Sequence, residues 1–134
     1  MATVRKDITT RAHPDDVWDA VRDIGALHTR LVPGFVIDTR LEPGARLVSF
    51  ANGQRVREPI VTLDTIGRRL VWSAEGIATH YNAAVQVLPE GEGTRIVWIA
   101  DFLPDDIAER IDAAMEAGAQ AMQAALEAQA MPGA

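Results

Sequence analysis

The sequence predicts one α+β domain, residues 1–134, in which a seven-stranded antiparallel sheet faces a long C-terminal helix. That helix covers residues 104 to about 129, and its apolar face carries alanine, glycine and methionine where a core helix usually carries leucine. Before it, turn residues separate six short strand-like segments. An opening strand and a short helix precede these six. The small side chains on the last helix predict a cavity between that helix and the sheet.

Length and composition indicate a single globular domain. A chain of 134 residues with 48% apolar and 24% charged residues can bury a sizeable core. No apolar run approaches the ~18 residues that a membrane span needs. The N-terminus alternates like a strand and lacks the apolar centre of a signal peptide. We therefore expect a cytoplasmic protein with no membrane partner.

The sequence lacks the residues and motifs that several kinds of functional site require. The chain has no cysteine, which excludes disulfides, thiolate nucleophiles and cysteine-ligated metals. Its formal charge of -6, with arginines scattered among carboxylates, argues against nucleic acid. The three histidines lie far apart, and neither a phosphate-binding loop nor a serine elbow occurs. The sequence therefore predicts no metal, no cofactor and no covalent hydrolase.

The first elements are an edge strand and a short helix. In residues 3–12, apolar and polar side chains alternate imperfectly, which is typical of an edge strand with one side exposed to water. Pro14 suits the first position of a helix, and Asp15 and Asp16 meet the positive end of its dipole. Gly25 is expected to end this helix, and a second helical turn is expected over residues 26–31. The buried face of the first helix is predicted to contain Val17, Ala20, Val21 and Ile24.

Turn chemistry divides the middle of the chain into strands. The expected strands cover residues 35–41, 46–51, 55–66, 69–75, 80–88 and 94–102. The pair Asn52-Gly53 is the strongest hairpin signal, because a type I′ turn needs positive φ at both central positions. Consecutive hairpins predict an antiparallel meander. No repeat, linker or low-complexity segment indicates a second domain.

The last helix presents one apolar face. At about 25 residues it would be roughly 37 Å long, which is enough to cross the concave face of the sheet. The small residues on its apolar face are consistent with a cavity beside the helix. They are also consistent with an ordinary packed core, because alanine is the best helix former. The predicted face contains Ile107, Ile111, Met115, Gly118, Met122 and Ala125 or Leu126.

Three sequence segments stand in a characteristic order: His13-Pro14-x-x-Val17-Trp18-x-x-Val21, then Val56 to Asp64 before Arg69-Leu70-Val71-Trp72, then Gly93-Thr94-Arg95-Ile96-Val97-Trp98. Together with the order of elements, they resemble the START-like helix-grip superfamily, and within it the bacterial polyketide cyclase/dehydrase group. The resemblance implies a seven-stranded sheet wrapped around the C-terminal helix, with an apolar pocket between them. Lipid carriers, hormone receptors, allergens and cyclases share this fold, so it does not specify a function.

Strand period predicts which side chains face the pocket. Trp98 shares one face of its strand with Ile96, Ala100 and Phe102, and this aromatic face is expected to point inward. Trp72 and Tyr81 belong to the corresponding faces of their strands. All three aromatic residues either pack as plain core or offer their polar tips to a ligand. The predicted pocket wall consists of Trp72, Trp98, Met115, Gly118 and Met122.

Glu58 is the polar residue that most suggests a site. It lies in period with apolar residues two positions away, and Pro59 is expected to cause a bulge beside it. The resemblance implies that a glutamate at this place lines the pocket of plant hormone receptors. Desolvation would raise the pKa of Glu58 and make it a proton carrier or a hydrogen-bond acceptor. The alternative is a salt bridge with Arg55 or Arg57 on the rim of the sheet.

Three functions stay open from the sequence. The first is binding of a small hydrophobic molecule, such as a polyketide, a lipid or an aromatic compound, with Glu58, His28 and Tyr81 as polar contacts. The second, implied by the resemblance, is cyclase/dehydrase catalysis with Glu58 as base and Tyr81 or His28 as acid. The third is a partner-binding module that uses Val97 and Ile99 on the outer face of the sheet. That apolar stripe is also a candidate homodimer contact.

Overall fold

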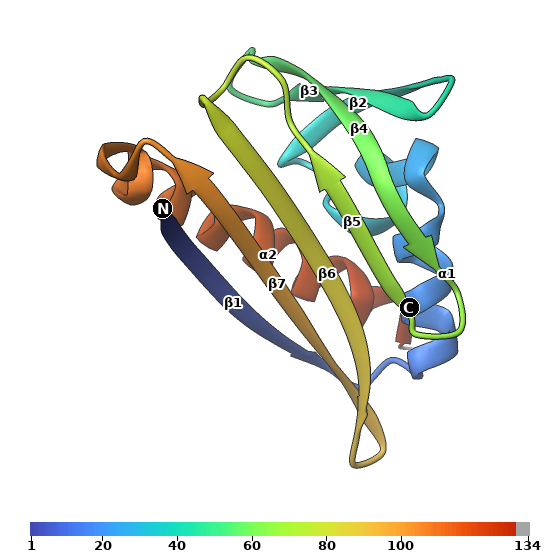
Figure 1. The fold of residues 1–134 in the computed structure, drawn as a ribbon. Coiled ribbons are helices and arrows are strands. Elements are labelled where there is room, and N and C mark those ends of the chain that lie inside the picture. The colour runs from blue at the N-terminus through green and yellow to red at the C-terminus, as the bar shows by residue number, and fades with distance from the viewer. Residues whose placement is uncertain (131–134) are drawn as a thin grey trace.

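The computed structural model describes residues 1–130 and shows seven strands, two α-helices and three short helical segments (Figure 1). The predicted fold class is confirmed. In chain order the elements are β1 (Ala2–Thr10), α1 (Pro14–Arg22), η1 (Ile24–Ala26), η2 (Leu27–Leu31), β2 (Val36–Glu42), β3 (Ala45–Phe50), β4 (Arg55–Asp64), β5 (Arg69–Ser73), β6 (His80–Glu90), β7 (Gly93–Leu103), η3 (Asp105–Ile107) and α2 (Ala108–Ala130).

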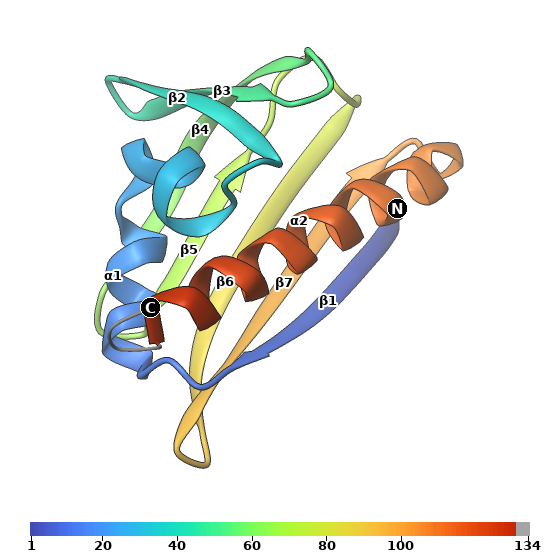
Figure 2. The same cartoon turned by 180° about the vertical axis from the view of Figure 1, so that it is seen from behind.

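The strands form one antiparallel sheet in the order β1-β7-β6-β5-β4-β3-β2. Consecutive strands from β2 to β7 are neighbours, as a meander requires, and β1 completes the sheet beside β7. Figure 2 shows α2 crossing the concave side of the sheet. Helix α1 contacts β6 and β7, and η1 and η2 contact the edge strand β2. The core therefore lies between one curved sheet and one layer of helices.

The β3–β4 hairpin differs from the expected type I′ turn. Gly53 has a φ of +94°, but Asn52 does not have a positive φ. The Gly53 N–H donates to the Phe50 carbonyl oxygen at 3.0 Å, and the Phe50 N–H donates to Gln54 at 2.8 Å. The Asn52 side chain accepts from the Gln54 N–H instead. The loop therefore has three residues and ends in a left-handed glycine, which moves the register by one position.

The β-bulge expected at Pro59 lies further along β4. Pairing of β4 with β3 is regular through Pro59, whereas pairing with β5 shifts between Ile60 and Thr62. The Ile60 N–H donates to Gly44 on the β3 side. Because successive N–H groups of a strand point to opposite sides, the missing N–H of Pro59 faces the β5 side. The proline therefore removes no bond from the β3 ladder.

Helix α1 begins at the predicted residue, Pro14, but ends before the predicted stop at Gly25. The His13 side chain caps it by accepting from the Asp15 N–H at 3.1 Å. The helix stops at Arg22, three residues before Gly25, because the Ala26 N–H donates to the Asp23 carbonyl oxygen and starts η1. The expected second helical turn is present as η1 and η2.

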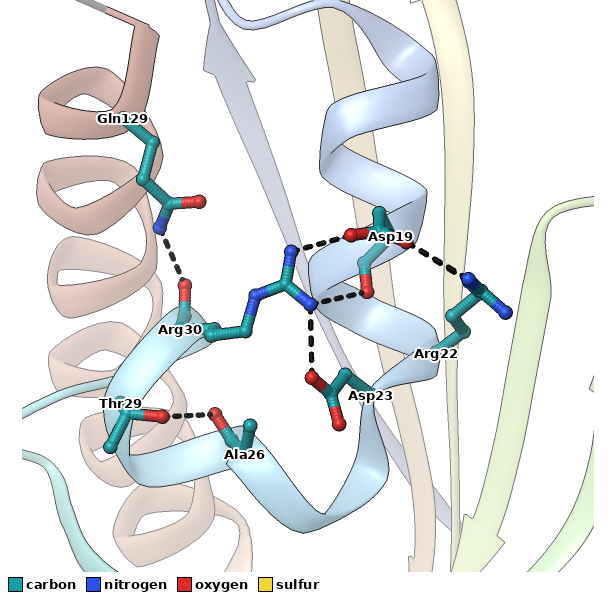
Figure 3. Close-up of polar contacts among 7 residues, drawn as sticks. All are labelled: Asp19, Arg22, Asp23, Ala26, Thr29, Arg30 and Gln129. Carbon is teal, nitrogen blue, oxygen red and sulfur yellow. Dashed lines mark hydrogen bonds and ion pairs between the residues drawn. The ribbon is translucent and has the colours of Figure 1, made fainter.

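Polar contacts join η2 to both helices. The Arg30 guanidinium donates to the carboxylates of Asp19 at 2.7 Å and Asp23 at 2.9 Å. The Gln129 side-chain amide donates to the Arg30 carbonyl oxygen at 2.8 Å (Figure 3). Residues from α1, η2 and the last turn of α2 are thus linked at one end of the molecule.

Further polar contacts join α2 to β1. Lys6 pairs with Asp112 and Glu116, each at 3.0 Å. The Gln123 side chain donates to the Thr9 carbonyl oxygen, also at 3.0 Å. Of the predicted apolar stripe, Met115, Gly118, Met122 and Leu126 are buried on α2, Ile111 is half-buried, and Ile107 is half-buried in η3. Ala119 is also buried, although the stripe did not include it.

The outer stripe of Val97 and Ile99 is half-buried within the sheet. Its register neighbours on β1 are Asp7 and Arg5, which form an ion pair at 2.7 Å. Gln86 of β6 lies on the other side of Val97. Charged and polar side chains therefore border this stripe, and the homodimer stays a prediction.

Candidate functional site

A cavity of about 880 Å³ lies between the sheet and the helices. Its buried wall comes from the inner faces of the strands and includes Val36, Val56, Leu70, Trp72, Val85 and Trp98. Its exposed rim comes from the η2–β2 loop, the β3–β4 hairpin, the β5–β6 loop and the first half of α2, and includes Pro33, Gly34, Asn52, Gln54, Gly76, Arg110, Ala114 and Ala117. The cavity is thus apolar inside and opens between three loops and a helix.

Six of the eight residues predicted to bind a ligand line this cavity: Glu58, Trp72, Tyr81, Trp98, Met115 and Met122. The other two, His28 and Gly118, do not. The His28 Nδ1 lies 3.1 Å from the Thr39 hydroxyl oxygen. Gly118 lies against Trp98, where an added Cβ would be 2.9 Å from the indole ring. The helix needs a glycine there because the tryptophan fills the space.

The cavity contains a buried ion pair between neighbouring strands. Arg46 and Glu58 are register partners on β3 and β4, and the Arg46 Nε donates to Glu58 Oε1 at 2.9 Å. The two side chains are only 3% and 9% exposed. The Arg46 guanidinium carbon also lies 5.3 Å from the centre of the Trp72 ring, a cation–π arrangement. Neither rim arginine, Arg55 or Arg57, is the partner of Glu58.

Burial dominates the electrostatics of Glu58. Desolvation raises the pKa of its carboxyl above the ordinary value, and the charge and hydrogen bond of Arg46 offset this only in part. A carboxylate held by a single arginine inside an apolar wall is an available hydrogen-bond acceptor.

Tyr81 lies beside this pair. Burial, and then the negative charge of Glu58, raise the pKa of its hydroxyl. Its ring stacks on Phe102 with 6.2 Å between ring centres. Within residues 1–130 its hydroxyl makes no hydrogen bond, so it remains available to a ligand. The buried Trp98 Nε1 likewise has no partner among the described residues.

The raised pKa of Tyr81 allows a direct test of the burial of its hydroxyl, because Tyr81 is the only tyrosine of the chain. We expect no tyrosinate absorbance in the folded protein as the pH passes about 10, the value of a free tyrosine. The stability associated with this group is present below about pH 10 and is lost as the pH rises toward the folded-state pKa. Ultraviolet titration checks this, with the urea-unfolded chain as control. A folded-state midpoint at the control value would contradict the buried hydroxyl.

No three metal-ligating side chains converge within residues 1–130. No helix in the same region has the length and apolar character needed to cross a membrane.

Residues 1–130 match the family described as polyketide cyclase/dehydrase and lipid transport. The chain belongs to this family. Among curated proteins there is no match.

Solved structures show that this family member shares its fold with proteins of low sequence identity. A protein from Bacillus thuringiensis has a TM-score of 0.82 at 18% identity, covering 93% of this chain and 98% of its own. A protein from Thermobifida fusca has a TM-score of 0.75 at 26% identity, covering 97% and 93%. A norcoclaurine synthase variant from Thalictrum flavum, solved with a transition-state analogue, has a TM-score of 0.69 at 19% identity, covering 97% and 96%.

Arg46 is the site residue that sequence reasoning missed. It shares its strand face with Val48, which is fully buried. A lone arginine in period with apolar residues, opposite a glutamate on the next strand, was the available signal. Its detection depended on the correct hairpin register.

Proposed function

We propose that this family member binds a small hydrophobic molecule in the cavity between the sheet and α2. The observation that carries the proposal is a cavity of about 880 Å³ whose wall is mainly apolar and whose polar groups are few and convergent. Small-molecule sites in proteins have volumes of roughly 300–1,000 Å³ and this kind of lining. Glu58, Arg46 and Tyr81 supply the polar contacts, and the aromatic and methionine side chains supply the apolar ones.

Two measurements test this proposal. Native mass spectrometry of freshly purified protein should show a co-purified small molecule, and titration with the neutral dye N-phenyl-1-naphthylamine should show saturable fluorescence enhancement. The Ala121→Leu variant should weaken dye binding, because Ala121 lines the cavity. Ala124→Leu is the matched control, since Ala124 is exposed on the same helix and does not line the cavity. Absence of saturable binding, or an equal effect of both variants, would count against the proposal.

Catalysis in the same cavity is the second candidate, favoured by the shared location of Glu58 and Tyr81 and the raised pKa of Glu58. Glu58 would remove a proton from a polyketide carbon, and Tyr81 would protonate the oxygen that leaves as water. A short poly-β-keto thioester is a suitable substrate, and mass spectrometry would detect the loss of water from it. Turnover that disappears in Glu58→Gln, with dye binding retained, would favour the enzyme. Dye binding without turnover would favour the first proposal, that the protein binds a small hydrophobic molecule without converting it.

A further inference from the structure

The Arg46–Glu58 pair has unused hydrogen-bonding capacity. Only one hydrogen bond joins the two side chains, from Arg46 Nε to Glu58 Oε1, and Arg46 Nη1 makes a long contact of 3.5 Å with the Ile24 carbonyl oxygen. Within residues 1–130, Arg46 Nη2 and Glu58 Oε2 make no hydrogen bond. Neither is among the fully buried polar atoms that lack a partner. Both atoms are therefore accessible, and the cavity that both residues line is the space they face.

The pair also determines the charge of the cavity. Arg46 and Glu58 have opposite charges, Tyr81 is neutral at pH 7, and the remaining charged side chain of the lining, Arg110, is exposed at the rim. A neutral ligand with a hydroxyl group can donate to Glu58 and accept from Arg46 or Tyr81 without adding charge. A carboxylate ligand would add a second negative charge beside Glu58 in a desolvated space, which is unfavourable.

We propose that the Arg46–Glu58 pair makes the cavity selective for neutral ligands bearing a hydroxyl group, and against their carboxylate analogues. This inference rests on the proposed ligand-binding function and specifies its ligand class. The opposite preference should follow when the charge of Glu58 is removed. Glu58→Gln leaves the positive charge of Arg46 without its partner in the cavity, so this variant should prefer the carboxylate ligand to the hydroxyl ligand.

Three matched probes test the selectivity at pH 7. They are 2-naphthol, which is neutral, 2-naphthoate, which is ionised, and naphthalene, which has no polar group. We expect the wild-type protein to bind 2-naphthol at least about tenfold more tightly than 2-naphthoate, an effect typical of one hydrogen bond to a charged group. Glu58→Gln should bind 2-naphthoate more tightly than 2-naphthol. Isothermal titration calorimetry measures all affinities directly.

A double variant keeps the test decisive if Glu58→Gln fails to fold. Arg46→Met with Glu58→Leu replaces the pair by apolar side chains, a change that buried ion pairs often tolerate. The wild-type protein should also bind 2-naphthol more tightly than naphthalene, and in the double variant this difference should disappear. Equal binding of 2-naphthol and 2-naphthoate by the wild type, an unchanged preference in Glu58→Gln, or a retained 2-naphthol advantage in the double variant would each overturn the inference. Failure of all three probes to bind the wild type would instead contradict the proposed function.

Discussion

Arg46→Met is expected to lower the free energy of unfolding by about 3–5 kcal/mol at pH 7, the usual cost of removing one partner from a buried ion pair. The cause is the carboxylate that remains. Glu58 is 9% exposed and is held by a single charged partner. Without Arg46 it must stay charged in an apolar wall or take up a proton. Urea denaturation followed by tryptophan fluorescence measures the loss.

The pH dependence of this variant follows from the same carboxyl group. Burial already raises the pKa of Glu58 above 4.5, and removing Arg46 removes the interactions that lower it. A carboxyl with a raised folded-state pKa contributes stability that is present below the unfolded-state value and is lost as the pH rises through the folded-state value. The cost of Arg46→Met should therefore be smaller at pH 5 than at pH 8. Adding Glu58→Leu should restore most of the stability; a double variant as unstable as the single one would refute this explanation.

Gly118→Leu is expected to destabilise the fold by about 3 kcal/mol, the upper part of the range for overpacked cores. The sequence placed Gly118 in the predicted pocket wall, where a leucine would be expected to fill the cavity and leave the fold intact. In the structure, however, a Cβ at Gly118 would lie 2.9 Å from Trp98 and 3.1 Å from Phe35. A leucine must displace both rings. Thermal or urea unfolding should show the loss.

Ala121→Leu is the control for this position on the same helix. Ala121 lines the cavity, so a larger side chain there has open space to enter. We expect a stability change below about 1 kcal/mol, together with weaker dye binding. If Gly118→Leu left the unfolding midpoint unchanged, close packing of α2 against Trp98 would be refuted.

The layout of the fold was predictable because its signals are local. Pro14, the helical spacing around Val17 and the turn glycines each report on a few neighbouring residues, and together they predicted the order of elements. Element ends were less predictable. Helix α1 ends at Arg22 because the Ala26 N–H turns back to Asp23, and the residue types there do not mark that turn.

The site was predictable only in part, and a single register shift explains much of the gap. A two-residue turn at Asn52-Gly53 would have paired Leu47 with Glu58. The observed three-residue loop pairs Arg46 with Glu58 instead. Gly118 shows a different limit: periodicity identified the buried face of α2, but whether that face meets an empty space or Trp98 depends on strands distant in sequence. His28 was expected to contact the ligand, but it lies outside the cavity lining, beside Thr39.

The attachment of α2 has a kinetic consequence. Polar contacts hold the helix to β1 through Lys6 and Thr9, to Arg11 just after that strand, and to η2 at its last turn. Among residues 1–130, no hydrogen bond joins it to the three loops of the rim, which are the η2–β2 loop, the β3–β4 hairpin and the β5–β6 loop. A molecule could therefore enter or leave by moving rim side chains, without breaking any bond of α2. Its exchange rate should then respond to changes in those loops while the unfolding rate of the protein stays constant.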